Sequence, residues 1–518
     1  MDMNNESSYL VSRKCADVHA ESAGDYILPD YLGDVRRILF TEASVRPCGR
    51  FGGGDELELS GVVLYTIVYL DTDGGLSSAE LTTDFDYLVK CSGESVGDAI
   101  VDTAISGYSI RPTGPRKISA RASLVGSVRL CENRQMRLCG SAFDPGREPE
   151  LNNGYAAIRQ SRVSSPLERE YAESLAKIEG GIAEEISVVY SSAEPIVESV
   201  SAEGNEAVIK GKIRMIAVMR SSDEPAYTVE KQIGFEERLE LDGITDGIEL
   251  IPALTVSSVK TSVNGDESGC EVVMSVIVEA SVLGESNGRV GLVLDGYLKE
   301  CATENQYSDF GYTELIEVAS VKGSHTAEML RADLDSEGLR EILFLTATPK
   351  VERVEAKENR VNLLGEIRYS GVASEMVGDS VSYTGVKFSS PFAVDVNVSC
   401  QNSDNIQIES RVKAYNASAL LDQDKLYASC TLECGVTLSE EKTVRVLSSM
   451  NASDSEDSRP SSVVTVYYPT EGDTLFSVAK RYRTSCLKIA GDNDISSTVF
   501  ASDNPTGSLS GVKQLLIY

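Results

Sequence analysis

Few side chains in this chain of 518 residues could form a metal centre or a catalytic triad. There are two histidines, His19 and His325, and they lie far apart in the sequence. Imidazole is the usual general base and a common metal ligand, so two such groups leave little for a His-based triad or a His-rich metal site. Both lie in polar stretches and are expected to face solvent. Carboxylates are abundant, but no spacing nominates an acid/base pair. We therefore expect no enzyme, no metal and no cofactor.

The eleven cysteines are odd in number and scattered along the chain. The closest pairs are Cys131/Cys139 and Cys430/Cys434, and neither has a CxxC spacing or a nearby histidine that would complete a zinc set. A secreted disulfide scaffold would be shorter and more densely spaced. The cysteines are expected to be ordinary, partly buried thiols in a reducing compartment.

Two short segments could bind a charged ligand. The glycine-rich RFGGGDE (50–56) lacks the GK[ST] of a phosphate loop and lies between β segments, so it is expected to be a hairpin tip. The basic segment GPRKISAR (114–121) stands out in an acidic chain. It is either a contact for an acidic partner or an edge strand protected by charge.

The net charge of −32, from 48 basic and 80 acidic residues, argues against nucleic acid and anionic membranes as partners. Hydrophobic residues make up 42% of the chain, which is enough to build several cores. The N-terminus shows no apolar region after a basic start, and the most hydrophobic run, GVVLYTIVYL from Gly61, is about half the length of a spanning helix. These features predict a soluble, cytoplasmic protein.

The elements that carry these residues repeat three times. The repeated unit has a short apolar segment, a strand that begins with glycine, and a later phenylalanine followed by alternating residues. Gly61 and Phe85 are 24 residues apart, as are Gly211 and Phe235, while Gly365 and Phe392 are 27 apart. Successive glycines lie 150 and 154 residues apart. This regular spacing predicts three copies of one domain.

Alternation of apolar and polar residues within each copy predicts half-buried strands, with EGN (203–205) and KEN (357–359) as hairpin turns. The fold class is therefore mainly β, with three tandem β-sandwich-like domains. One helix is expected around 166–179, where proline can occupy the first turn. The predicted boundaries are 20–145, 165–310 and 325–445 for the three domains, 446–462 for a Ser/Asp-rich linker, and 463–518 for a small C-terminal module.

The C-terminal module is predicted to have the order strand, helix, helix, strand (βααβ). Asp473 or Thr474 can cap a helix in which Leu475, Val478, Ala479 and Tyr482 form one apolar face. A second short helix is expected in CLKIAGDNDI (486–495), and the closing GVKQLLIY (511–518) suggests a last strand beside the first. The residues of this turn and helix are required for the fold whether or not anything binds there.

Two family resemblances follow from these motifs. The segments YILPDYLGDVRRILFTEA (26–43), RPTGPRKISARASL (111–124) and LDGYLKE (294–300), with the repeated glycine and phenylalanine, resemble the SPOCS domain of clostridial spore-coat morphogenetic proteins over about residues 26–440. The YxPxxGDTLxxVAxRY string resembles a LysM module over about residues 464–518. The LysM resemblance implies a shallow groove for N-acetylglucosamine glycans or for proteins, lined here by Gly472, Asp473, Thr474, Leu475, Asn493 and Ile495. The long stretch 496–511 and the missing terminal proline depart from the LysM pattern next to this groove.

The resemblances imply a non-enzymatic adaptor of spore coat or envelope assembly in the mother-cell cytoplasm, at the forespore surface. Its implied partner is the scaffold ATPase of the basal coat, contacted through the β domains and the LysM-like module. The alternative is a cell-wall protein that binds peptidoglycan or a chitin-like glycan and anchors a hydrolase. The N-terminal sequence and the lack of a recognisable hydrolase motif favour the adaptor, for which no nucleic acid partner and no membrane insertion are expected.

Overall fold

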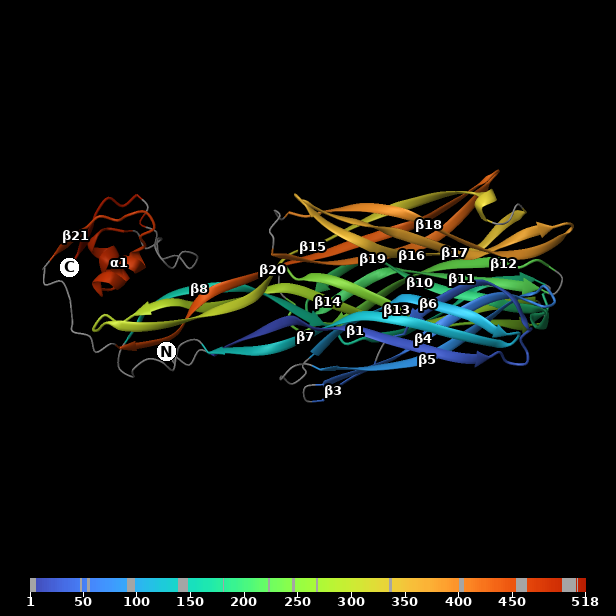
Figure 1. Ribbon diagram of the computed structural model, residues 1–518, viewed down its shortest axis with the longest axis horizontal. Coiled ribbons are helices and arrows are strands. Elements are labelled where there is room, and N and C mark those ends of the chain that lie inside the picture. The colour runs from blue at the N-terminus through green and yellow to red at the C-terminus, as the bar shows by residue number, and fades with distance from the viewer. Residues whose placement is uncertain are drawn as a thin grey trace.

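The protein is mainly β, as the sequence predicts. The structure is a computed structural model that describes residues 6–46, 49–53, 56–90, 98–137, 148–179, 181–221, 224–244, 247–266, 269–334, 338–399, 405–452, 464–495, 509 and 511–518. Six larger sheets make up the described body, and a two-stranded sheet lies in the C-terminal segment. The body is elongated, and the C-terminal module lies at one end of it (Figure 1).

The first repeated segment forms two sheets. One sheet has the order β1-β7-β6, and the other has the order β2-β4-β3 with β5 also paired to β4. The strands are β1 (Glu6–Ile27), β2 (Val35–Val45), β3 (Gly49–Gly53), β4 (Glu56–Asp71), β5 (Leu76–Lys90), β6 (Asp98–Gly114) and β7 (Lys117–Arg137). Alternate apolar residues of β4, β5 and β7 meet between the sheets in one core.

The second segment repeats this arrangement. Its sheets have the orders β10-β11-β12 and β13-β14-β8, with β9 also paired to β14. The elements are β8 (Glu150–Val163), β9 (Leu167–Glu179), the 3₁₀ turn η1 (Ala183–Glu185), β10 (Ile186–Glu203), β11 (Glu206–Ser221), β12 (Tyr227–Glu240), β13 (Glu249–Asp266) and β14 (Gly269–Tyr297). Side chains of β11, β12 and β14 form its core.

The third segment has sheets of order β15-β20-β19 and β16-β17-β18. Its elements are β15 (Thr303–Leu330), the 3₁₀ turn η2 (Arg331–Leu334), β16 (Leu339–Lys357), β17 (Arg360–Val377), β18 (Ser380–Asn397), β19 (Ile406–Asp422) and β20 (Lys425–Ala452). Its core lies between β17, β18 and β20. The turns expected at 203–205 and 357–359 join β10 to β11 and β16 to β17.

The glycine and phenylalanine of each repeat are cross-strand partners. Gly61 pairs with Phe85, Gly211 with Phe235, and Gly365 with Phe392. A Cβ on Gly365 would lie 2.1 Å from the carbonyl oxygen of Lys350 and 2.8 Å from the Phe392 ring. The ring therefore occupies the space above a strand that has no side chain at this point, an arrangement that stabilises glycine in sheets. The spacing of 24 or 27 residues reflects the length of the hairpin between the two partners.

An aromatic cluster joins the three segments. The rings of Phe40, Tyr190 and Phe344 contact one another, with centroid distances of 5.6 Å for Phe40–Tyr190, 4.9 Å for Phe40–Phe344 and 4.0 Å for Tyr190–Phe344. These residues hold the same place in their repeats, and each directly follows a break in strand register. Such a bulge redirects side chains. Here it lets consecutive residues such as Val189 and Tyr190 enter the shared cluster.

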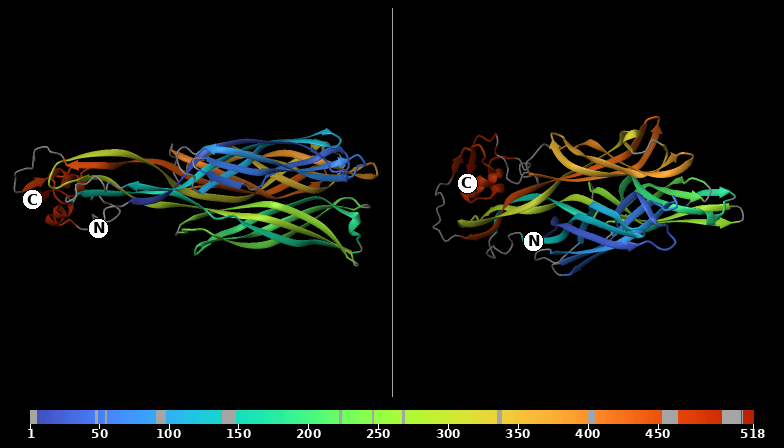
Figure 2. Two further views of the ribbon diagram at one scale, coloured as in Figure 1. Left: turned by 90° about the horizontal axis from the view of Figure 1, so that it is seen from below. Right: turned by 45° about the vertical axis from the view of Figure 1, so that its right-hand side comes forward.

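The ends of long strands connect this body to the C-terminal module. The late part of β14, the early part of β15 and the end of β20 extend together with β8 from the body toward the module (Figures 1 and 2). Small apolar clusters fill this extension, one of them built from Val293, Leu298, Leu447 and Met450. The module lies at the end of this extension, apart from the rest of the body.

The module contains β21 (Thr465–Tyr467), α1 (Leu475–Tyr482), α2 (Cys486–Asp492) and β22 (Leu515–Ile517), in that order. The two strands pair antiparallel, Thr465 opposite Ile517. Leu475, Val478, Ala479, Ile489 and Leu515 are buried in its core. The apolar face expected for the first helix therefore faces inward.

Several predicted elements are wrong in detail. Residues 167–179 form strand β9 and not a helix, because β14 offers a long edge with which they pair from Leu167 to Glu179. Residues 446–452, assigned to the linker, are the end of β20. Strand β15 begins at Thr303, inside the range assigned to the second domain, and β1 begins at Glu6, before the first. Local sequence does not reveal these pairings with distant strands.

Candidate functional site

The candidate groove residues of the module begin at the turn before α1. Thr474 is the N-cap of the helix: its Oγ1 accepts a hydrogen bond from the Ser477 N–H at 3.0 Å, and the Ser477 Oγ accepts one from the Thr474 N–H at 3.0 Å. This reciprocal pair satisfies amides that the helix leaves open. Gly472 has φ of 90°, which a residue with a Cβ rarely adopts, and it is exposed. Both residues thus act in forming the turn.

Asp473 organises the turn electrostatically. Its Oδ2 accepts hydrogen bonds from the Tyr467 hydroxyl at 2.6 Å and from the backbone N–H and the hydroxyl of Thr470, both at 2.8 Å. These donors, led by Tyr467, lower the pKa of Asp473 to about 2, with Arg481 nearby adding to the effect. The carboxylate therefore remains ionised at neutral pH and closes the loop between β21 and α1.

The other candidates are taken up by the fold. Leu475 is fully buried in the module core, so it is not available to line a groove. The Asn493 amide donates to the carbonyls of Ile489 and Leu516 and accepts from the Leu516 N–H, so it ties the end of α2 to β22. Ile495 packs against the same core as Leu475. Most of the six candidate residues thus form contacts within the fold, and these contacts account for the amino acid found at each position.

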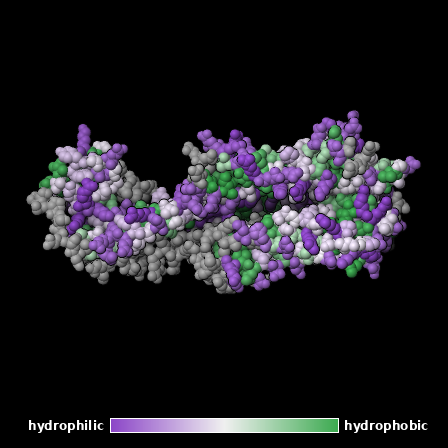
Figure 3. Space-filling model, in the orientation of Figure 1, coloured by the Kyte–Doolittle hydropathy of each residue, from purple (hydrophilic) through white to green (hydrophobic). Residues whose placement is uncertain are grey.

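Apart from Leu487 on α2, the exposed large apolar side chains of the described part of the module lie along its two strands. Val464, Val466, Tyr468 and Tyr518 are 42%, 48%, 66% and 54% exposed, whereas the alternating Thr465 and Tyr467 turn inward. The pairing of Val466 with Leu516 places these side chains on the outer face of the two-stranded sheet. Figure 3 shows apolar surface at the end of the module farthest from the body. The sequence VVTVYY (463–468) indicates this exposed apolar face, because alternate residues of a strand lie on the same side and here they are apolar.

The module is docked on the body through the segment LDGYLKE. Tyr297, the last residue of β14, is buried among the module's core residues, and its ring centroid lies 5.3 Å from that of Phe476. Its hydroxyl donates to the Thr484 carbonyl at 2.6 Å. Lys480 Nζ lies 2.6 Å from both carboxylate oxygens of Asp295. Sequence reasoning missed this contact, because nothing local links residues 185 positions apart.

The Asp295 carboxylate accepts hydrogen bonds from several donors. The Tyr307 hydroxyl and the Asn305 amide also donate to its Oδ1, at 2.7 and 2.9 Å. Burial acts to raise the pKa of Asp295, but the hydrogen bonds from Lys480 and Tyr307 outweigh it and hold that pKa below its ordinary value. The ion pair therefore persists at neutral pH and fixes the module to the body.

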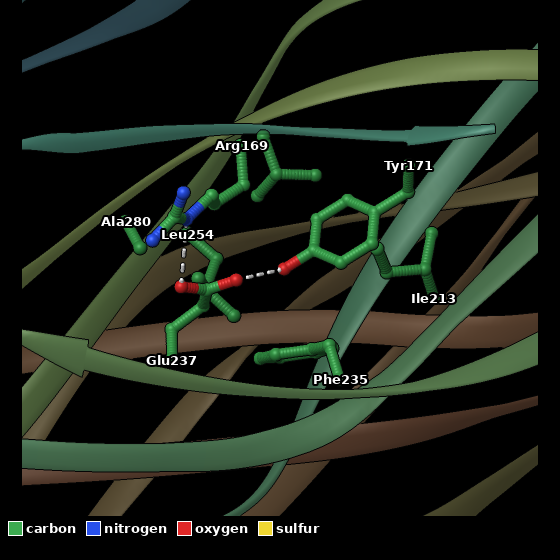
Figure 4. Close-up of a pocket in the computed structure, with 8 residues that line it drawn as sticks. Arg169, Tyr171, Ile213, Phe235, Glu237, Leu254 and Ala280 are labelled. Carbon is green, nitrogen blue, oxygen red and sulfur yellow. Dashed lines mark hydrogen bonds and ion pairs between the residues drawn. The ribbon is translucent and has the colours of Figure 1, made fainter.

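A small hollow lies between the sheets of the second segment (Figure 4). Glu237 accepts a hydrogen bond from the Tyr171 hydroxyl at 2.6 Å and one from Arg169 Nε at 3.3 Å. Burial, and then the bond to Glu237, raise the pKa of Tyr171, so the phenol stays protonated. The space is about 210 Å³ with open solvent included, whereas ligand pockets measure roughly 300–1,000 Å³. This hollow is therefore smaller than the usual range of ligand pockets.

The cysteines that the sequence analysis singled out do not form a metal site in the described part of the chain. Cys430 and Cys434 are free and buried, as is Cys270, and burial raises the pKa of Cys434 to about 11, which keeps the thiol protonated. Cys131 and Cys139 lie outside the residues whose side chains are described. Among the described residues, no three His, Cys, Asp or Glu side chains are placed to hold a metal ion, and no helix is long and apolar enough to cross a membrane.

His19 is exposed, as expected, but His325 is half-buried, with Nε2 3.2 Å from Ser390 Oγ. The edge-strand interpretation of GPRKISAR is wrong, because β7 is the central strand of its sheet. Arg116 instead donates to the carbonyls of Leu28, Pro29 and Leu32, and so holds the turn that leads into β2. Of the segment RFGGGDE, expected to be a hairpin tip, residues 50–53 belong to strand β3, which pairs antiparallel with β4 from Glu56. The two residues between the strands, 54 and 55, lie outside the described residues.

Comparison with known proteins adds no relative. No family model, no curated protein and no solved structure matches the chain.

Proposed function

We propose that the protein is a non-enzymatic adaptor of spore coat or envelope assembly. In this proposal the three repeated segments are SPOCS-like, sandwich-type domains, the C-terminal segment is a LysM-like module, and the chain works in the mother-cell cytoplasm at the forespore surface. Its partner is the scaffold ATPase of the basal coat. The resemblances in the sequence suggest this assignment, and the outer face of the module supports it.

The observation that carries the proposal is the exposed apolar face of the β21–β22 sheet. Val464, Val466, Tyr468 and Tyr518 expose large apolar side chains in a module of about 55 residues that has no net charge. Clustered apolar and aromatic side chains are typical of protein interfaces, where a few anchors provide most of the binding energy. The groove candidates, by contrast, are engaged in internal contacts. A protein partner on the sheet face therefore fits better than a glycan in the groove.

The body supports the role of a rigid platform. The aromatic cluster joins the three segments, and the Asp295–Lys480 pair fixes the module at one end. When a platform fixes several binding surfaces relative to one another, binding of one surface increases the effective concentration of the others at the assembly site. The β domains and the module then bind as parts of one unit.

The direct test is binding of the full chain to the purified coat scaffold ATPase. The double variant Val466→Asp/Tyr468→Ser should weaken binding at least tenfold, because loss of an interface anchor costs about 2 kcal/mol or more. The matched control is Leu420→Ser, which removes an apolar side chain that is 67% exposed on β19. That variant should bind like the unmodified chain. Circular dichroism must show that both variants are folded.

A second arm separates the adaptor from a wall-binding protein. Sedimentation of the full chain with insoluble peptidoglycan should leave it in the supernatant. Strong co-sedimentation that is lost on deleting residues 464–518, together with unchanged ATPase binding by the double variant, would refute the adaptor proposal in favour of glycan binding.

A further inference from the structure

The end of the body opposite the module is built by turns of all three segments (Figure 1). Strand β14 ends at Tyr297 against the module, so the turn at its start lies at this opposite end. The segments contact one another here. Arg220 Nη1 donates to the Leu76 carbonyl at 3.0 Å, and the Ala226 N–H donates to the Tyr383 hydroxyl at 2.8 Å. The turns of the three segments therefore lie side by side.

Large apolar side chains are exposed on these turns. In each segment, such a side chain lies where the chain passes from one sheet to the other: Ile27 and Tyr31 before β2, Ile182 before β10, and Leu330 before β16. Tyr31 is 84% exposed and Ile27 is 77% exposed. The same passage thus exposes apolar surface in all three repeats.

The β17–β18 turn adds two more apolar side chains, Met376 and Val377, and Val377 is 58% exposed. The Met376 N–H donates to the Gly338 carbonyl at 2.9 Å, which places this turn beside the passage into β16. The core beneath is filled by other residues of the passages, such as the buried Leu28 and Leu334. The far-end surface consists of Ile27, Tyr31, Ile182, Leu330, Met376 and Val377. Apolar side chains grouped on a surface mark a site of interaction.

Carboxylates surround the far-end surface. Exposed acidic residues on the same turns are Asp30, Asp73, Glu184, Glu185, Glu224, Asp379 and Asp424. The basic residues of these turns are engaged within the fold, since Arg116 and Arg331 donate to backbone carbonyls, Lys117 pairs with Asp25, and Lys425 pairs with Glu328. The exposed charge around the apolar side chains is therefore mainly negative. Figure 3 shows apolar areas between hydrophilic ones at this end of the body.

This combination specifies the chemistry of a partner. Exposed apolar anchors bind apolar side chains, and an acidic rim favours lysine and arginine around them. The same carboxylates repel anionic lipid and the equivalent end of a second copy of the chain. A protein segment whose apolar side chains are flanked by basic ones meets both requirements.

We propose that the far-end surface docks a protein segment of apolar and basic side chains, carried by a partner other than the one on the module. The two docking faces lie at opposite ends of the molecule, so one chain holds two proteins apart by the length of the body. This second contact goes beyond the adaptor's contact through the module and does not depend on it.

Calorimetric titration of the full chain with short synthetic peptides tests the proposal. A peptide in which leucine and lysine alternate should bind saturably, at least about tenfold more tightly than a peptide with serine in place of leucine. The serine peptide measures the attraction of charge alone. A peptide with glutamate in place of lysine should not bind, because the acidic rim repels it.

Variants of the chain locate the site. Tyr31→Ser/Val377→Ser removes two anchors, leaves the charge unchanged and should weaken binding of the leucine–lysine peptide at least about tenfold. The matched control is Tyr155→Ser/Leu88→Ser, which removes side chains that are 50% and 53% exposed elsewhere on the body. This control should bind the peptide like the unmodified chain, and circular dichroism must show that both variants are folded.

The proposal is overturned if the leucine–lysine and serine–lysine peptides bind equally well, or if the two double variants behave alike. Loss of peptide binding in Val466→Asp/Tyr468→Ser would place the peptide on the module and would also overturn it. Flotation with phosphatidylcholine vesicles should leave the chain unbound. Flotation that is lost in Tyr31→Ser/Val377→Ser would assign the far-end surface to lipid instead.

Discussion

At the scale of single residues, most polar side chains that the sequence marks as candidate ligands form internal hydrogen bonds. Thr474 caps α1, Asn493 connects α2 to β22, and Asp473 closes the turn between β21 and α1. A short polar side chain at a helix start satisfies backbone amides that would otherwise lack partners. The residue types of this loop are therefore explained by folding, and binding has to use other side chains of the module.

Asp473 gives a pH-dependent prediction at this scale. Its folded-state pKa of about 2 lies below the ordinary value of 3.8, so its hydrogen bonds stabilise the turn above about pH 4 and are lost as the pH falls toward 2. Hydrogen exchange of the full chain, measured by mass spectrometry, should show the turn between β21 and α1 opening across that interval. Asp473→Asn should open the turn already at pH 6 and remove the acid transition. An unchanged acid transition in Asp473→Asn would assign it to another group.

At the scale of strands and hairpins, the sequence allowed the repeated units to be found but not all of their pairings. The glycine and phenylalanine spacing was visible because each hairpin is local, and Gly365 and Phe392 face each other across one turn. Strand β9 was mistaken for a helix because its apolar residues fit both periods and its partner β14 lies about 100 residues later. The Arg159–Glu409 contact spans 250 residues, so no local pattern could reveal it.

The paired glycine gives a prediction for the strands. A Cβ at Gly365 would lie 2.1 Å from the Lys350 carbonyl oxygen, so Gly365→Ala must move a backbone segment and should destabilise the third segment by about 1–3 kcal/mol. A lower urea midpoint in equilibrium unfolding would show this. Gly291→Ala, in β14, meets no atom within 4 Å and should change the midpoint little. Equal effects of the two substitutions would mean that close approach of the backbone does not restrict Gly365.

At the scale of the whole molecule, the three segments pack around one shared cluster and do not form a row of independent domains. Phe40, Tyr190 and Phe344 occupy equivalent places in the repeats and contact one another, with Val68, Val218 and Val372 in the same cluster. The rings of Tyr190 and Phe344 stack in parallel, and Phe40 meets both of them edge-on. Each segment thus contributes one ring to the contact that joins the three segments.

The last prediction concerns the attachment of the module to this body. Tyr297 places its ring against Phe476, and its hydroxyl donates to the Thr484 carbonyl. Tyr297→Ala therefore removes both contacts, while the Asp295–Lys480 pair remains at the junction of β14 with α1. That ion pair, whose side chains are 32% and 25% exposed, orients the module less firmly without the packed ring. Small-angle scattering of the full chain should then show a broader distribution of distances as the module separates from β14. The matched control is Tyr155→Ala on β8, which removes an exposed ring stacked under Arg289 and should leave the scattering unchanged. Identical curves for the two variants would mean that the ring of Tyr297 does not hold the module in place.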